Sequence, residues 1–258
     1  MFPLPDIKSL QTGGISVLNE FSRTELLLGA EGMEKLKKSH VAVFGIGGVG
    51  SYIAEALARC GVGKLTLIDN DTVAVTNLNR QLIALHSTIG MKKTEAAKAR
   101  ILDINPAAQV TALDCFYTGT EVDLSDFDYI ADAIDTVSSK LALIENAYKL
   151  NVPLISSMGT GNKLDPTKLT VTDIYKTEMC PLAKVMRYEL KRRNVKKLKV
   201  VYSTEKPREH KAESEEITAK RKTIGSVSFV PSVAGLIIAG EIVRDILKNS
   251  CNFSEKMA

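Results

Sequence analysis

The chain has 258 residues, of which 45% are hydrophobic and 25% are charged, and its formal net charge is +4. These values are ordinary for a soluble globular protein, and the length suffices for one sizeable core, so we expect a single domain over residues 1–258. No uncharged run reaches the ~20 apolar residues that a membrane-spanning helix needs, and the N-terminal segment lacks the pattern of a secretory signal. We therefore expect no membrane association and a cytoplasmic location.

The four cysteines, Cys60, Cys115, Cys180 and Cys251, are far apart in the sequence. None forms a C-x-x-C pair, so the sequence predicts neither a zinc knuckle nor a disulfide framework.

Predicted helices and strands alternate along the chain. Apolar runs bounded by glycine, proline and asparagine predict the strands, and mixed apolar and charged stretches predict the helices. The alternation predicts an α/β fold with a doubly wound, Rossmann-like parallel sheet. In chain order, we expect helix 19–38, strand 41–44, helix 51–60, strand 64–68, helix 93–104, strand 109–113, strand 129–133, helix 136–150, strand 152–156, strand 169–174 and a helix from Leu182.

Two later segments differ in composition. The uncharged run Ile224–Gly240 predicts a buried helix, since it is too short and too interrupted to span a membrane. The polar run Glu205–Lys222 has no aromatic residue and predicts a loop.

A glycine-rich turn joins the first strand to the second helix. Gly45, Gly47, Gly48 and Gly50 let the backbone approach a phosphate, and the amides at the start of the helix favour negative charge. Asp69 ends the next strand, where a carboxylate accepts hydrogen bonds from ribose hydroxyls. Up to this point an NAD site and an ATP site fit equally well.

The residues that follow Asp69 favour ATP. Asn77 and Arg80, together with Lys93 at the start of the next helix, supply the amide and cationic groups that a triphosphate needs. Asp135 follows another strand and is a candidate Mg²⁺ ligand. Each has a simpler interpretation: Arg80 and Lys93 as surface charges, and Asp135 as the N-cap of helix 136–150.

An ordered set of motifs resembles the ubiquitin-activating-enzyme-like superfamily of adenylating enzymes. The set consists of Arg23, Gly45–Ser51, Asp69-Asn-Asp71, Asn77-x-Asn79-Arg80-Gln81, Gly90-x-x-Lys93 and Asp132-x-x-Asp135. The resemblance implies that Gly48, Asp69, Asn77, Arg80, Lys93 and Asp135 bind ATP and Mg²⁺. It also implies a homodimer in which Arg23 reaches the phosphates of the neighbouring subunit. The implied catalytic groups are Arg23, Arg80, Lys93 and Asp135.

The second half of the chain resembles one branch of that superfamily. Carrier-activating bacterial relatives usually hold zinc with two C-x-x-C pairs, which this sequence lacks. Instead, 159–166, 174–177, 181–193 and 225–235 are similar to the tRNA threonylcarbamoyladenosine dehydratase family. This resemblance implies ATP-dependent dehydration of N6-threonylcarbamoyladenosine at position 37 of tRNA through an acyl-adenylate. A monovalent cation is a further candidate cofactor, and the sequence does not decide whether the reaction requires it.

Two other functions stay open. One is adenylation of the C-terminus of a ubiquitin-like sulfur-carrier protein, with such a protein as partner, and the other is a plain dinucleotide-binding oxidoreductase. Many relatives have aspartate where this chain has Cys180, so this chain departs from the family pattern and has no acidic group at that position. A thiolate at Cys180 would be favoured by Lys176 and Lys184, yet a lone cysteine is more often a small packed hydrophobic residue.

Positive charge gathers between Pro181 and Ile224, where 14 Lys and Arg face 6 Asp and Glu. On the helix from Leu182, the sequence places Leu182, Val185, Met186 and Leu190 on one face and Lys184, Arg187 and Lys191 on another. The basic face suits the backbone of tRNA, because each phosphate contact releases counterions. A solvated surface segment is the alternative.

Overall fold

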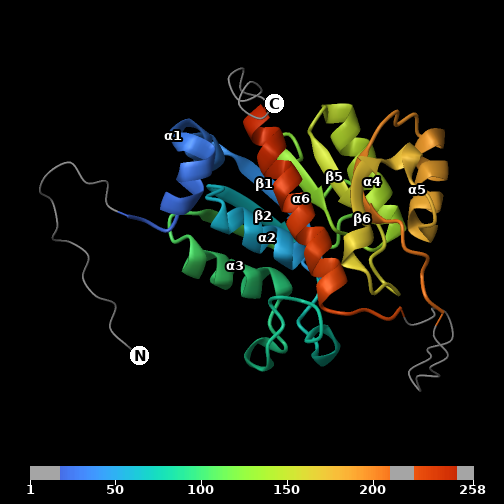
Figure 1. Cartoon of the computed structure of the whole chain (residues 1–258), viewed down its shortest axis with the longest axis horizontal. Helices are drawn as coiled ribbons and strands as arrows, with labels where there is room; N and C mark the ends of the chain where they lie inside the picture. Colours follow the sequence, from blue (N-terminus) through green and yellow to red (C-terminus); the bar gives the residue numbers. More distant parts are fainter. Residues whose placement is uncertain (1–17, 210–223, 249–258) are drawn as a thin grey trace, which may run out of the picture.

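A computed structural model of the chain describes residues 18–209 and 224–248. A seven-stranded sheet with the order β3-β2-β1-β4-β5-β7-β6 forms the centre (Figure 1). All neighbouring strands are parallel except β6, which runs antiparallel to β7. The strands are β1 (His40–Phe44), β2 (Lys64–Ile68), β3 (Gln109–Leu113), β4 (Tyr129–Asp132), β5 (Leu154–Ser157), β6 (Leu169–Asp173) and β7 (Lys199–Ser203).

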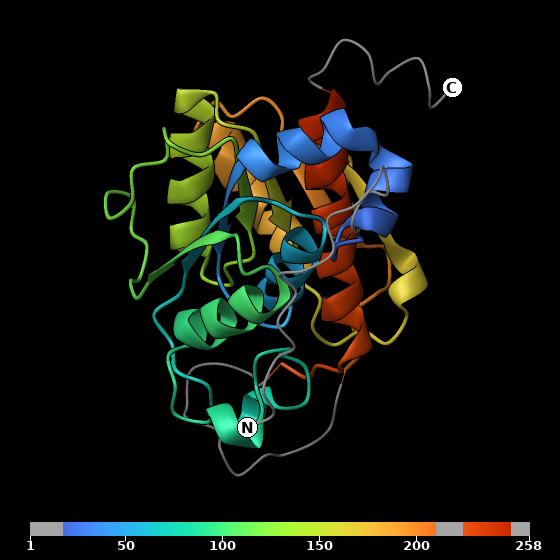
Figure 2. The ribbon, with the colours of Figure 1, turned by 90° about the vertical axis from the view of Figure 1, so that its left-hand side faces the viewer.

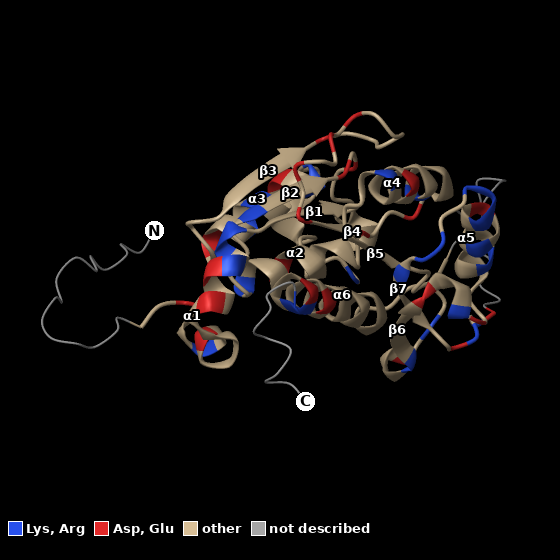
Figure 3. Cartoon of the chain, turned by 90° about the horizontal axis from the view of Figure 1, so that it is seen from above, with Lys and Arg blue, Asp and Glu red and all other residues tan. Residues whose placement is uncertain are grey.

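Helices cover both faces of the sheet. On one face α2 packs against α3 and α6, and on the other α4 packs against α5 (Figure 3). Helix α1 lies at the side of the molecule and contacts α6 (Figure 2). The helices are α1 (Ser22–Lys38), α2 (Gly50–Arg59), α3 (Lys93–Ile104), α4 (Val137–Leu150), α5 (Pro181–Arg192) and α6 (Phe229–Lys248).

The central strands are buried because helices cover them on both sides. All four residues of β4 are buried, and in β1 only His40 is partly exposed. Strands of a parallel sheet covered on both faces are expected to be continuously apolar. From β1 the chain continues outward through β2 to β3 and then crosses back to β4 on the other side of β1, and this reversal places a crevice at the carboxyl ends of β1 and β4.

The sequence prediction of a doubly wound α/β fold is confirmed, with differences at several boundaries. Helix α1 begins at Ser22, and it is broken at Gly29, where a φ of 71° interrupts the helical backbone. Strand β4 ends at Asp132. Strand β7 was not predicted, although its middle residues are buried; it pairs with both β5 and β6.

The segments after β7 also depart from expectation. Helix α6 begins at Phe229, so the predicted helix over 224–240 is wrong for its first five residues, and Ile224 is exposed. Glu205 is buried and accepts the backbone amides of Leu164 and Asp165, unlike a solvated loop residue. Residues 210–222 of the predicted loop lie outside the described residues. Within 18–209 and 224–248, no helix combines the length and apolar character needed to cross a membrane.

Candidate active site

The carboxyl ends of β1, β2 and β4 open into a cavity of about 530 Å³. Residues that the sequence assigns to the nucleotide come from four separate segments and meet on its wall. They are Gly45, Gly47, Gly48, Asp69, Asn77, Arg80, Lys93 and Asp135.

The glycine turn has no room for a side chain at Gly45 and little room at Gly48. Gly45 has a φ of 86°, and a Cβ there would lie 2.7 Å from the carbonyl oxygen of Ala133. At Gly48 a Cβ would lie 3.3 Å from side-chain atoms of both Arg80 and Pro231. Because α2 begins at Gly50, the turn presents the free amides of a helix N-terminus beside the cavity.

Asp69 connects the glycine turn to the loop after β2 through hydrogen bonds. Its carboxylate accepts the amide of Ile46 at 2.6 Å and the amide of Asp71 at 2.8 Å. Burial raises the pKa of Asp69, while Lys93 and the two amides act in the opposite direction. The carboxylate is therefore held rigidly at the strand end.

Lys93 is 5% exposed, which excludes the interpretation as a free surface charge. Its Nζ lies 2.6 Å from Asp71 Oδ2 and 3.9 Å from Asp69 Oδ1. The ammonium group is thus positioned on the cavity wall by carboxylates from the neighbouring strand end.

Asn77 and Arg80 line the cavity from the segment between β2 and α3. The side chain of Asn77 accepts the amide of Ala74 at 3.0 Å, which leaves its NH₂ group available. Arg80 donates to the carbonyl of Thr76 and to the side chain of Asn79, each at 2.9 Å. Both contacts use one terminal nitrogen, so part of the guanidinium stays available to a ligand.

Asp135 is exposed and contacts only the hydroxyl of Thr136, at 3.4 Å. Helix α4 has Thr136 at its N-cap position and no side-chain capping bond, so the interpretation of Asp135 as N-cap is wrong. The carboxylate therefore faces the cavity without a structural task in the helix.

Three buried polar side chains form a hydrogen-bonded cluster at the end of β4, just before Asp135. Asp132 Oδ2 accepts from Lys140 Nζ at 2.7 Å and from Ser156 Oγ at 2.6 Å, and all three residues are fully buried. Asp132 Oδ1 accepts the amide of Ile134, which lines the cavity. Sequence reasoning missed Lys140 and Ser156, although a lysine eight residues after a strand-end aspartate in an apolar helix was an available signal.

Two buried polar atoms on the cavity wall have no hydrogen-bond partner in the described structure: Gln81 Oε1 and Ser139 Oγ. Both atoms are inaccessible to solvent, so they lie behind the cavity surface that other atoms of the two residues form. The sequence analysis also missed Phe116, a lining residue that is 49% exposed and presents an aromatic ring.

The opposite wall comes from the second half of the chain and includes Gly159–Gly161, Leu182, Ser226 and Pro231. Lys163 is buried and donates to the carbonyls of Gly159 at 3.0 Å and Ser203 at 3.4 Å. Burial lowers the pKa of Lys163. Asn79 bonds to the carbonyl of Ser226 at 3.0 Å, which joins the two walls.

Arg23 is exposed on α1 and does not line the cavity. Near it on the same helix, Leu26 and Leu27 are 86% and 84% exposed, and Leu18 just before the helix is also exposed. The apolar positions of α1 that do reach the core are Leu28 and Leu36.

The basic helix differs from its prediction at two positions. Ala183, Met186 and Leu190 are the buried residues of α5, whereas Val185 is exposed. Lys184 and Lys191 extend into solvent as expected. Arg187 is partly buried, and it donates to the carbonyl of Thr177 at 2.8 Å and to the Thr177 hydroxyl, so it holds the preceding turn.

Cys180 is 3% exposed and packs in the apolar cluster formed by α4, α5 and β7. It stands at the N-cap position of α5, and its sulfur would lie 3.8 Å from a Cβ placed at Gly159. This environment favours the packed hydrophobic residue over the exposed nucleophile. Cys60 and Cys115 have a raised pKa because of burial. Cys251 lies outside the described residues.

Comparison with known proteins bears on the family and the fold of the chain. The ThiF family matches residues 21–258. The chain belongs to the ThiF family. A Bacillus subtilis protein, tRNA threonylcarbamoyladenosine dehydratase, is 48% identical over 245 residues, which cover 90% of this chain and 96% of the relative. The family resemblance inferred from the motifs is therefore confirmed.

Solved structures of the E. coli tRNA N6-threonylcarbamoyladenosine dehydratase have the same fold as this ThiF-family chain. The complex with AMP superimposes with a TM-score of 0.82 at 36% identity, covering 89% of this chain and 94% of the other. The complex with ATP gives a TM-score of 0.79 at 34% identity and covers 93% and 96%. The similarity thus extends over both walls of the cavity.

Proposed function

We propose that this protein is an ATP-dependent dehydratase that cyclises N6-threonylcarbamoyladenosine at position 37 of tRNA. The observation that carries the proposal is the convergence of the glycine turn with Asp69, Arg80, Lys93 and Asp135 on one cavity. The names of the relatives, one of which is solved with ATP, support the same activity. Since tRNA is the substrate, we place the reaction in the cytoplasm.

ATP occupies the 530 Å³ cavity in this proposal. Its ribose hydroxyls donate to Asp69, and its phosphates lie over the amides of the Gly45–Gly50 turn, which stabilise negative charge. The side-chain amide of Asn77 and the cations Arg80 and Lys93 bind phosphate oxygens.

Mg²⁺ fits the residues present. Asp135 offers an exposed carboxylate to the cavity, and within the described ranges no three His, Cys, Asp or Glu residues cluster into a metal site. Mg²⁺ typically takes one or two protein carboxylates and completes its shell with phosphate oxygens and water. Held by Asp135, the ion would neutralise charge on the departing pyrophosphate.

The chemistry requires two displacements. The threonine carboxylate of the substrate attacks the α-phosphorus, and pyrophosphate leaves. A nitrogen of the same modification then attacks the acyl carbon, closes a five-membered ring, loses its proton and expels AMP. Ring closure is intramolecular, so orientation and exclusion of water supply most of what the protein must add. Charge that develops on the phosphates is stabilised by Arg80 and Lys93.

Arg23 completes the phosphate site from a second subunit in this proposal. It does not line the cavity of its own chain, although the resemblance assigns it to the phosphates. Leu18, Leu26 and Leu27 form an exposed apolar surface beside it, which suits burial in a homodimer. The tRNA backbone lies along Lys184 and Lys191 of α5, with Arg187 acting on the turn beneath.

Mass spectrometry of tRNA nucleosides tests the function. Incubation with the protein and ATP should convert the modified adenosine to a product lighter by about 18 Da, the mass of one water, with one AMP released per ring closed. Omission of tRNA should abolish AMP release. If AMP release instead required a ubiquitin-like carrier protein and ignored tRNA, the dehydratase proposal would fail in favour of carrier activation.

A further inference from the structure

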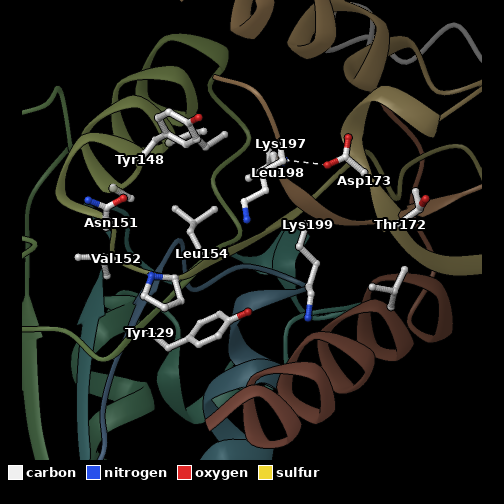
Figure 4. Close-up of a pocket in the computed structure, with 14 residues that line it drawn as sticks. Tyr129, Tyr148, Asn151, Val152, Leu154, Thr172, Asp173, Lys197, Leu198 and Lys199 are labelled. Atoms are coloured by element: carbon white, nitrogen blue, oxygen red, sulfur yellow. Dashed lines mark hydrogen bonds between the residues drawn. The ribbon is translucent and has the colours of Figure 1, made fainter. Parts of the chain in front are cut away.

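A second cavity, of about 610 Å³, lies at the opposite end of the sheet from the nucleotide cavity. It opens at the amino ends of β4, β5 and β7, beside the C-terminal end of α4 (Figure 4). This volume is typical of sites for small organic molecules. No residue lines both cavities.

The interior of this back cavity is largely apolar. Ile144 and Ala147 of α4 line it together with Leu154, Leu198 and Val171. Leu154 lies where two separate apolar clusters of the core meet, so the cavity extends between them. A ligand with an apolar body would gain free energy by covering this surface.

Three of the polar side chains that line the back cavity already have partners. Lys199 Nζ lies 2.6 Å from Asp245 and 3.1 Å from Glu241. The Tyr129 hydroxyl donates to Asp245 at 2.7 Å. The carboxylate of Asp173 accepts one backbone amide on each oxygen, including that of Leu198 at 3.1 Å, the dashed line in Figure 4.

Among the charged residues that line the back cavity in the described part of the chain, Lys197 alone has no partner, and it is exposed to solvent. Figure 4 shows its side chain reaching into the cavity toward Leu154. Among the described residues no carboxylate lies within ion-pair distance of its ammonium group. An unpaired positive charge beside an apolar surface is complementary to a molecule with one anionic group and an apolar body.

We propose that the back cavity is a second ligand site for a small organic anion with an apolar body. The anionic group pairs with Lys197, and the body covers Leu154 and Leu198. Nucleoside di- and triphosphates fit this cavity poorly, because several phosphates would find only one unpaired cation here.

Anilinonaphthalene sulfonate is a suitable probe because it combines an aromatic body with one sulfonate. Uncharged phenylnaphthylamine has the same body without the anion and serves as the matched ligand. Fluorescence titration should give one site of about unit stoichiometry, with the sulfonate bound about three- to tenfold more tightly, the value of one charge-assisted contact. Saturating ATP should leave both affinities unchanged.

Lys197→Gln should remove the preference for the sulfonate, whereas Lys196→Gln, at an adjacent exposed lysine that does not line the cavity, should preserve it. Val152→Trp, on the cavity wall, should weaken both ligands at least tenfold by filling the space, and thermal unfolding checks that it folds. If that variant fails to fold, the Lys197 and Lys196 pair decides the proposal alone.

Four results would overturn the proposal. If Lys197→Gln and Lys196→Gln reduced the preference for the sulfonate equally, the probe would be attracted by surface charge in general. If the wild-type protein bound the two ligands with equal affinity, the cavity would be apolar without recognising an anion. Competition by ATP would place the probe in the nucleotide cavity. Loss of binding as the chain concentration rises would mean that a second copy of the chain covers the back cavity.

Discussion

Lys93 Nζ lies 2.6 Å from the carboxylate of Asp71, so the cation proposed to bind the triphosphate is paired with an exposed carboxylate when no nucleotide is bound. In the proposed site, ATP competes with Asp71 for this ammonium group, and the Asp71 charge also repels the phosphates. The pair therefore limits the affinity for ATP.

Replacing Asp71 should consequently strengthen ATP binding. We expect Asp71→Asn to lower the Kd by about two- to fivefold, a partly screened charge effect, and Lys93→Gln to raise it about tenfold or more. Isothermal titration calorimetry measures both. Asp114→Asn is the matched control because Asp114 pairs with the neighbouring Lys92 at 2.9 Å outside the cavity lining, and it should leave the Kd unchanged. Weaker binding by Asp71→Asn would show that Asp71 orients Lys93 productively.

The dimer proposal predicts complementation between two inactive variants. In a mixed dimer of Arg23→Ala and Arg80→Ala chains, one of the two composite sites keeps both arginines. Random mixing should restore about a quarter of the wild-type activity, since half of the dimers are mixed and each has one intact site. AMP release on tRNA measures the recovery. Hybrids as inactive as their parents, or a monomer in sedimentation at working concentration, would contradict the cross-subunit role of Arg23.

Breaking the buried ion pair of Lys140 and Asp132 should lower the free energy of unfolding more than breaking an exposed ion pair does. Lys140→Met leaves the Asp132 carboxylate buried without its counter-charge, so we expect a loss of about 3–5 kcal/mol in the free energy of unfolding. Adding Asp132→Asn removes the charge and should recover part of that loss. Lys149→Met, which breaks an exposed pair with Glu145 at 2.9 Å, should cost less than ~1 kcal/mol. Denaturant unfolding compares the three, and a similar cost for the two lysines would refute the role of burial.

Glu55 should contribute stability that is lost in acid. Burial is the largest single influence and acts to raise its pKa, but the hydrogen bonds and the charges of Arg100 and Arg59 together outweigh it, and the net pKa is lowered. Glu55 is therefore more readily ionised in the folded state than in the unfolded one. Its contribution is present above the unfolded pKa, near 4.5, and disappears as the pH falls through the lower folded pKa.

Glu55→Gln should accordingly destabilise the protein by about 1 kcal/mol at pH 7 and reduce the steepness of the acid transition. Thermal unfolding from pH 7 to pH 3 provides the measurement. Glu34→Gln serves as control, since Glu34 forms only exposed pairs at 3.9 and 4.0 Å, and its unfolding curves should match those of the wild type. A pH-independent loss in Glu55→Gln would contradict the linkage.

Replacement of the two exposed lysines of α5 should weaken tRNA binding through salt-dependent contacts. Lys184→Ala with Lys191→Ala should make the slope of log affinity against log salt shallower by roughly 1.4–1.8, at ~0.7–0.9 per phosphate contact. ATP affinity should not change. Arg187→Ala should instead lower thermal stability, because Arg187 holds Thr177. An unchanged slope in the double variant would locate the RNA surface elsewhere.

The sequence predicted most of the sheet and one wall of the nucleotide cavity because local patterns determine both. Strand runs are apolar along the chain, and Gly45, Asp69 and Lys93 stand at fixed distances from strand ends. The buried Lys140 was missed because its partners, Asp132 and Ser156, come from two separate strands. Strand β7 was missed because alternating lysines precede its apolar core, and its pairing with β5 and β6 is non-local.

Helix α6 begins at the nucleotide cavity, where Pro231 faces Gly48, and Gly235 allows the backbone of Val49 to approach closely. Nearly 200 residues of synthesis separate the glycine turn from this wall. A chain that is still on the ribosome and has formed β1, β2 and α2 therefore lacks one wall of its proposed ATP site. In the proposed site, ATP contacts both walls only after residues 226–235 have docked, so we expect ATP to stabilise the complete chain and not a partly synthesised one.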